Sequence, residues 1–129
     1  MNFKGVIIEE SLEDKSVLKE LNILQTDIKI VTEKYKTPWL KQWTLHTFEI
    51  DEGKADMIAE TVSKGLESEH NWYADFKNDK THYIVYKNKI FKVNRTRADQ
   101  YLEAKKYGIS LGIPEYQVDF SPEVVIEKK

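Results

Sequence analysis

An aspartate and a histidine that could work as a catalytic pair, Asp75 and His82, lie on two neighbouring stretches rich in strand-forming residues. The polar residues at 78–79 separate these stretches and are a signal for a tight turn. If residues 78–79 form the turn, antiparallel pairing places Asp75 directly opposite His82. A carboxylate beside an imidazole fixes its tautomer and stabilises its charged form, which is what a general base requires. The spacing therefore predicts a candidate site of proton transfer.

The same register places two phenols, Tyr73 and Tyr86, on the surface that carries this pair. The opposite surface is apolar and is predicted to be core; it collects Trp72, Ala74, Phe76, Tyr83 and Val85. In the enzymatic interpretation, the phenols or Lys92 would orient a small anionic substrate. In the structural interpretation, the cross-strand Asp-His pair is a sheet contact worth about 0.2–1 kcal/mol.

Aromatic residues provide a second candidate surface, for binding a ligand. Trp39 and Trp43 share one face of a predicted strand beside a proline turn, and such an aromatic wall suits a small ligand or a subunit contact. His46, on the same strand, is interpreted as a core or rim residue. The three histidines of the chain show neither the i,i+2 strand spacing nor the i,i+4 helix spacing of a metal site. We therefore expect no metal ion and no cofactor.

Composition narrows the class of protein. The chain has 129 residues and no cysteine, which excludes thiolate catalysis, disulfide bonds and cysteine-based zinc sites. Its N-terminal apolar run is too short for a secretory signal or a membrane span. We expect one cytoplasmic domain covering residues 1–129, with no membrane partner.

Charge is nearly balanced overall, at −2, but it is unevenly distributed. Residues 77–106 contain nine basic and three acidic side chains, a net charge of +6, whereas residues 48–70 contain seven acidic and two basic ones, a net charge of −5. Opposed patches of this kind could steer an anionic ligand or dock one subunit on another. With so many acidic residues, nucleic acid is not the expected partner.

Periodicity locates the elements that would position these residues. Strands are predicted over 3–9, 24–35, 39–50 and through the antiparallel stretch 70–93, and helices after Ser11, over 51–67 and over 96–112. Ser11 and Thr96 each stand three residues before an acid, which is capping-box spacing. Asp51 is the predicted N-cap of the second helix, and Gly112 is the predicted left-handed C-cap of the third.

The order of these elements predicts an α+β fold. Strand, helix, strand, strand, helix, strand is the split βαβ order of a ferredoxin-like antiparallel sandwich, here with an added C-terminal β-hairpin and helix. If the added strands extend the sheet, the last helix can cover the face that the first two helices leave open. That placement would explain the apolar residues on both faces of the strand at 83–86.

Four stretches of the chain, FKGVIIEESL, KTPWLKQWTLH, HNWYADFKND and YGISLGIPEYQVDF, resemble a family of small conserved bacterial and archaeal proteins of uncharacterised function. The resemblance spans nearly the whole chain. It implies a self-standing cytoplasmic domain, and it implies no activity, cofactor or catalytic residue.

The residues alone leave three hypotheses of function open. The first is a small ligand-binding or protein-interaction module, expected to be a homodimer, with a pocket between the sheet and the C-terminal helix. The second is an enzyme that uses Asp75 and His82 for proton transfer on a small anionic substrate. The third is a weak single-stranded nucleic-acid binder that uses the basic segment 77–106.

Overall fold

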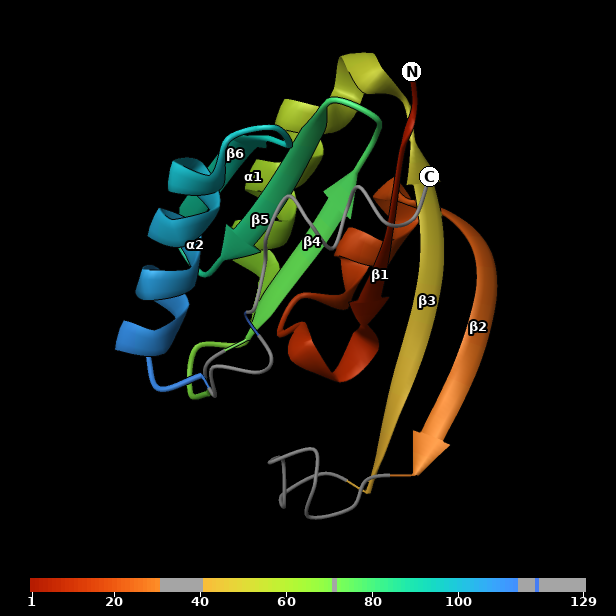
Figure 1. Ribbon diagram of the computed structural model, residues 1–129. Coiled ribbons are helices and arrows are strands. Elements are labelled where there is room, and N and C mark those ends of the chain that lie inside the picture. Colours follow the sequence, from red (N-terminus) through yellow and green to blue (C-terminus); the bar gives the residue numbers. More distant parts are fainter. Residues whose placement is uncertain (31–40, 71, 114–117, 119–129) are drawn as a thin grey trace.

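The computed structural model describes residues 1–30, 41–70, 72–113 and 118, and in these residues it has one six-stranded antiparallel sheet (Figure 1). The strands are β1 (Phe3–Ile8), β2 (Asn22–Ile30), β3 (Gln42–Ile50), β4 (Tyr73–Lys77), β5 (Thr81–Tyr86) and β6 (Lys89–Asn94). Their order across the sheet is β2-β3-β1-β4-β5-β6, and each neighbouring pair is antiparallel. The α+β class expected from the sequence is confirmed.

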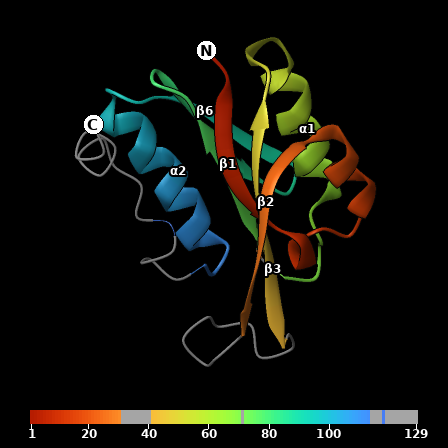
Figure 2. The same ribbon diagram turned by 90° about the vertical axis from the view of Figure 1, so that its right-hand side faces the viewer.

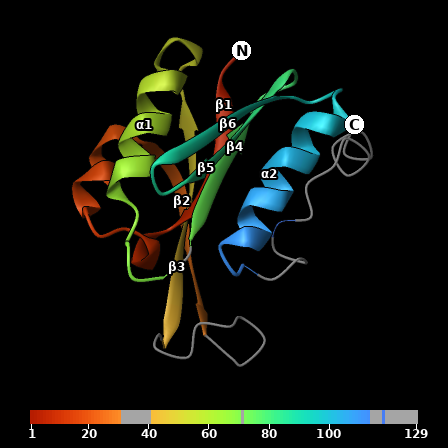
Figure 3. The ribbon, with the colours of Figure 1, turned by 90° about the vertical axis from the view of Figure 1, so that its left-hand side faces the viewer.

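Helices cover both faces of the sheet. The main helices are α1 (Ala55–Gly65) and α2 (Ala98–Ser110), and the short 3-10 segments are η1 (Glu9–Ser11), η2 (Lys15–Glu20) and η4 (Glu52–Lys54). Views from the two sides show α1 and α2 on opposite faces of the sheet (Figures 2 and 3). The predicted covering of the open face by the last helix is therefore confirmed. No helix in the described part of the chain has the length and apolar character to cross a membrane.

The main core lies between the sheet and α1. Its helical side is an amphipathic stripe in which Ala55, Ile58, Ala59, Val62 and Leu66 are each at most 2% exposed. Its sheet side includes Phe3, Ile7, Phe48, Ile50, Trp72, Ala74, Phe76, Tyr83 and Val85. Burying so much apolar surface is the main stabilising contribution to the fold, at about 25 cal/mol per Å².

A second, smaller core lies between the sheet and α2. It consists of Ile84, Tyr86, Val93, Tyr101, Ala104, Ile113 and Val118. Strand β5 therefore sends alternate side chains into two different cores, and every residue from His82 to Tyr86 is buried. This confirms the two buried faces that the run at 83–86 predicted.

The structure corrects the predictions of how the helices begin. The segment after Ser11 is not an α-helix: the Ser11 hydroxyl donates to the Ile8 carbonyl, and Asp14 caps η2 by accepting from the Ser16 N–H. Asp51 precedes η4 and makes no side-chain cap. The capping box at Thr96 is also absent, because Asn94 Oδ1 accepts from both the N–H and the hydroxyl of Thr96.

The predicted end of α2 is confirmed. Gly112 has a φ of 94°, in the left-handed region that favours glycine. Its N–H donates to the Ile109 carbonyl, and the Ile113 N–H donates to the Gly108 carbonyl. These bonds satisfy carbonyl groups that the helix itself leaves without partners.

A substitution at Gly5 tests the close approach of β1 and β4. A Cβ added at Gly5 would collide with the main-chain oxygen of Asp75 and lie 2.8 Å from the Cβ of Phe76. We expect Gly5→Ala to lower the free energy of unfolding by about 1–3 kcal/mol, because the backbone must shift. Gly53→Ala is the matched control, since nothing lies within 4 Å of its added Cβ. Equal effects of the two changes in urea unfolding would contradict the strand packing.

Candidate functional site

The hairpin that carries the candidate pair turns one residue later than the sequence predicted. The Asn78 N–H donates to the Thr81 carbonyl at 3.0 Å, and Asn78 Oδ1 accepts from the N–H groups of Lys80 and Thr81 at 2.9 Å. Asp75 therefore pairs with Ile84, and the predicted register, with Asp75 opposite His82, is wrong by two residues. The cause is the side chain of Asn78, which closes the turn from its first position.

A shift of two residues keeps every side chain on its predicted face, because strand side chains alternate with a period of two. Asp75 and His82 consequently meet diagonally across the ladder. The distance between Asp75 Oδ2 and His82 Nε2 is 2.7 Å, a charge-assisted hydrogen-bond length. The contact between the two side chains is present even though the register that predicted it is not.

The second nitrogen of His82 is held by α2. Nδ1 lies 3.0 Å from the hydroxyl of Tyr101 on this helix. In a neutral imidazole, Nε2 donates to Asp75 and Nδ1 accepts from Tyr101. His82 is 3% exposed and Tyr101 is 1% exposed. Both ring nitrogens are thus hydrogen-bonded inside the protein. A general base, by contrast, needs a nitrogen within reach of the proton that it removes from its substrate. The chain Asp75–His82–Tyr101 is suited to fastening α2 to the sheet.

Two phenols lie on the same face, as predicted. Tyr86 is fully buried and its hydroxyl donates to the Ala104 carbonyl at 2.7 Å. Tyr73 is partly buried, and its ring centroid lies 6.1 Å from that of Tyr86. Burial raises the pKa of both hydroxyls, and the negative charge of Asp75 raises each pKa further. They are neutral parts of the second core and are not poised to lose protons.

Arg95 borders this cluster and was missed by the sequence analysis. Its Nη1 donates to the Asn78 carbonyl, and its Nε is buried with no hydrogen-bond partner among the residues that the structure describes. Burial raises the pKa of Tyr101, while the nearby charge of Arg95 acts in the opposite direction. No local sequence signal marks Arg95, because its neighbours come from the turn and from α2.

The other predicted ligand-binding residues do not join the pair. Lys92 extends from the opposite face of the sheet, where its Nζ lies 3.5 Å from Asp56 Oδ1 and 5.5 Å from the ring centroid of Tyr83. The Trp43 ring packs edge-on to Trp72, with centroids 6.1 Å apart. Trp39 lies outside the described residues.

His46 is buried and forms a separate hydrogen-bond network with two residues nearer the surface. Its Nε2 lies 2.8 Å from Glu9 Oε1, and its Nδ1 lies 2.8 Å from Thr26 Oγ1. The residue is 8% exposed and lies on the face opposite Asp75. His46 therefore joins η1, β3 and β2, which fits its interpretation as a rim residue with both nitrogens bonded.

The third histidine stands beside two carboxylates. Potential ligand atoms of Glu67, Glu69 and His70 all lie within 4.8 Å of one another. Glu67 already accepts from Trp72 Nε1 at 3.0 Å and contacts His70 Nδ1 at 2.7 Å. These bonds explain the cluster as a loop contact, and the expectation of no metal stays a prediction.

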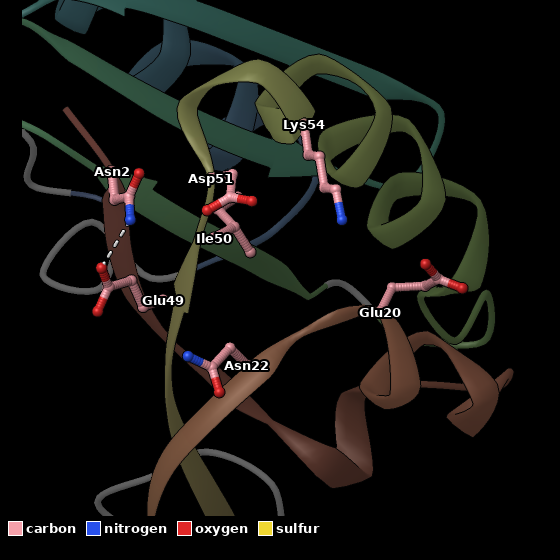
Figure 4. A pocket seen from close by; sticks show the side chains of 7 residues that line it. All are labelled: Asn2, Glu20, Asn22, Glu49, Ile50, Asp51 and Lys54. Carbon is pink, nitrogen blue, oxygen red and sulfur yellow. Dashed lines mark hydrogen bonds between the residues drawn. The ribbon is translucent and has the colours of Figure 1, made fainter.

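Two cavities lined by described residues lie away from these histidines. One has a volume of about 170 Å³ and is lined by Asn2, Glu20, Asn22, Glu49, Ile50, Asp51 and Lys54. Figure 4 shows Asn2 hydrogen-bonded to Glu49 on one side of this cavity, and Lys54 and Glu20 on the other side. The second, of about 240 Å³, lies between α1 and the turn from β5 to β6. Neither occupies the predicted position between the sheet and α2, where the second core packs.

Comparisons with protein-family models, with curated proteins and with solved structures found no match to this chain. The family resemblance suggested by the sequence therefore stays a prediction.

Removing the hydroxyl of Tyr101 tests whether its bond to His82 holds α2 against the sheet. We expect Tyr101→Phe to lower the free energy of unfolding by about 1–2 kcal/mol, because a buried nitrogen of His82 would lose its partner. Tyr107→Phe on the same helix is the control, and it should change stability by less than about 0.5 kcal/mol. Urea unfolding of both variants measures the difference. A loss as large for Tyr107→Phe as for Tyr101→Phe would contradict the proposed role.

The raised pKa of Tyr73 predicts a loss of stability in alkali. Above the ordinary tyrosine pKa of 10.0, the unfolded chain releases this proton whereas the folded chain keeps it. The folded state then binds more protons, so its stability is complete below pH 10 and falls as the pH rises further. Urea unfolding between about pH 9 and pH 11 should show a shallower decline for Tyr73→Phe than for the wild type. Identical declines would show that this hydroxyl does not contribute.

Proposed function

We propose that the protein is a small non-catalytic interaction module, and that its binding surface is the outer edge of β2. This strand forms one end of the sheet, and all nine of its residues are exposed. An edge strand presents a row of main-chain N–H and C=O groups to any extended segment that approaches it. Strand addition at such an edge is a common mode of protein recognition.

Side chains of β2 support the proposal. Four aliphatic residues on this strand are exposed: Ile23 by 37%, Leu24 by 50%, Ile28 by 59% and Ile30 by 71%. Protein edges are usually protected by lysine, proline, bulges or a covering element. β2 has an irregularity at Leu24, but its pairing from Gln25 to Ile30 is regular and it carries one lysine. Exposed apolar residues grouped in this way are typical of contact surfaces.

The opposite edge of the sheet, β6, has more of the protective features than β2 has. β6 is shorter, with six residues, and carries exposed lysines at positions 89 and 92. Lysines on an edge strand oppose the approach of another strand. The contrast supports β2, and not β6, as the proposed pairing edge.

The alternative functions have weaker support. The bond between Asp75 and His82 favours the proton-transfer enzyme, but both nitrogens of His82 already have partners inside the protein. A small-molecule ligand and single-stranded nucleic acid stay predictions from the aromatic and basic residues. The absence of cysteine remains the basis for proposing a cytoplasmic location.

We also propose that strands β1 to β4 form a ferredoxin-like unit to which the hairpin of β5 and β6 and helix α2 are added. The supporting observation is their order, β2-β3-β1-β4, with all neighbours antiparallel. The connection from β3 to β4 contains α1, whereas the connection from β1 to β2 contains the 3-10 segments η1 and η2 in place of an α-helix.

Selection of peptides tests whether β2 receives an extended segment. Random nine-residue peptides selected on the protein should alternate apolar and polar residues and bind with dissociation constants of about 10–100 µM by fluorescence anisotropy. The double variant Ile28→Lys/Ile30→Lys should weaken this binding at least about tenfold, because it places two charges on the edge.

A matched control separates the edge from surface hydrophobicity in general. Met57→Lys/Leu102→Lys adds the same charge at helix positions of similar exposure, 50% and 49%. It should leave peptide binding unchanged. Equal binding by wild type and both double variants, or failure to select any peptide, would overturn the proposal.

A further inference from the structure

We propose that the segment received by β2 is the β2 strand of a second copy of this chain, paired antiparallel about a two-fold axis through Ile28. The inference rests on the proposed function and names its partner. It joins two six-stranded sheets edge to edge into one continuous sheet. The two identical edges are self-complementary, as a two-fold interface requires.

Charge complementarity selects the register. Asp27 and Lys29 project from one face of β2, while Thr26, Ile28 and Ile30 project from the other. With the axis at Ile28, Asp27 lies opposite the partner's Lys29 on one face. On the other face, Ile28 lies opposite the partner's Ile28. Two equivalent ion pairs therefore flank an apolar centre, and directly opposed pairs of these kinds stabilise a ladder.

Neighbouring registers are disfavoured by the same side chains. An axis through Asp27 would place Asp27 against the partner's Asp27, and an axis through Lys29 would oppose two lysines. An axis through Thr26 would extend the pairing to Leu24, where the ladder with β3 is interrupted between Ile23 and Gln25. The axis through Ile28 avoids both like charges and the irregularity.

Contacts within one copy already hold this part of β2 in place. The hydroxyl of Thr26 is bonded to His46 Nδ1 at 2.8 Å, and Gln25 Nε2 donates to Asp27 Oδ2 at 2.8 Å. The first contact fixes the strand against β3, and the second orients the carboxylate on its own face. An edge ordered before association loses less conformational entropy on pairing.

The interface is small, so the association is expected to be weak. Pairing over residues 26–30 is expected to bury less than the roughly 1,200 Å² of standard stable complexes, and a dissociation constant on the order of 10 µM is expected. Sedimentation equilibrium should show the weight-average mass rising from the monomer value of 15.2 kDa toward twice that value as concentration increases.

Charge reversal tests the register. Asp27→Lys places a lysine against the partner's Lys29, and Lys29→Asp places an aspartate against the partner's Asp27, so each variant alone should raise the dissociation constant about tenfold or more. An equimolar mixture of the two variants restores both ion pairs in a heterodimer. The double variant Asp27→Lys/Lys29→Asp restores them in a homodimer. Both preparations should associate as the wild type does.

Each other outcome overturns the inference. Dimers that are insensitive to these substitutions would lie at a different interface. Single variants that are not rescued by mixing would rule out this register. A wild type that stays monomeric while peptides still bind at Ile28 and Ile30 would mean that β2 receives a different protein, which leaves the proposed function standing. A monomer that selects no peptide would contradict both proposals.

Discussion

A strand in a sheet can form main-chain hydrogen bonds on two sides, and among the residues that the structure describes β2 pairs on one side only, with β3. Within the described residues, this unmatched edge is the constraint from which the functional account follows. The strand is long, regular over its second half, and carries four exposed aliphatic residues, of which Ile30 is 71% exposed. A second strand at such an edge would give the main-chain N–H and C=O groups hydrogen-bond partners. It would also remove the aliphatic side chains from water.

The two buried histidines each connect neighbouring elements of the fold by hydrogen bonds. His82 ties β4, β5 and α2 through Asp75 and Tyr101, and His46 ties η1, β3 and β2 through Glu9 and Thr26. Both histidines are buried, and burial of a polar ring is tolerated only when its nitrogens find partners. The network of His46 has a further effect, because its bond to Thr26 also holds the middle of β2, the edge that we propose as the binding surface.

Local patterns predicted much of this structure, and long-range packing decided the rest. The period of two was enough to place Asp75 and His82 on one face although the register was wrong by two residues. The helical period predicted a helix over 51–67, where α1 lies, and Gly112 predicted the end of α2. The capping boxes at Ser11 and Thr96 failed because nearby side chains and carbonyls offered competing bonds. Neither Tyr101 as a partner of His82 nor the edge position of β2 has a local signal, since both depend on residues distant in the sequence.

Amide hydrogen exchange across β2, measured residue by residue at dilute and concentrated protein, tests the central claim most directly. The account predicts that every second amide from Thr26 to Ile30 exchanges more slowly as concentration rises, because outward N–H groups become bonded to a second strand. Amides of β6 should be unaffected in the same samples. Exchange rates along β2 that do not depend on protein concentration would contradict the account.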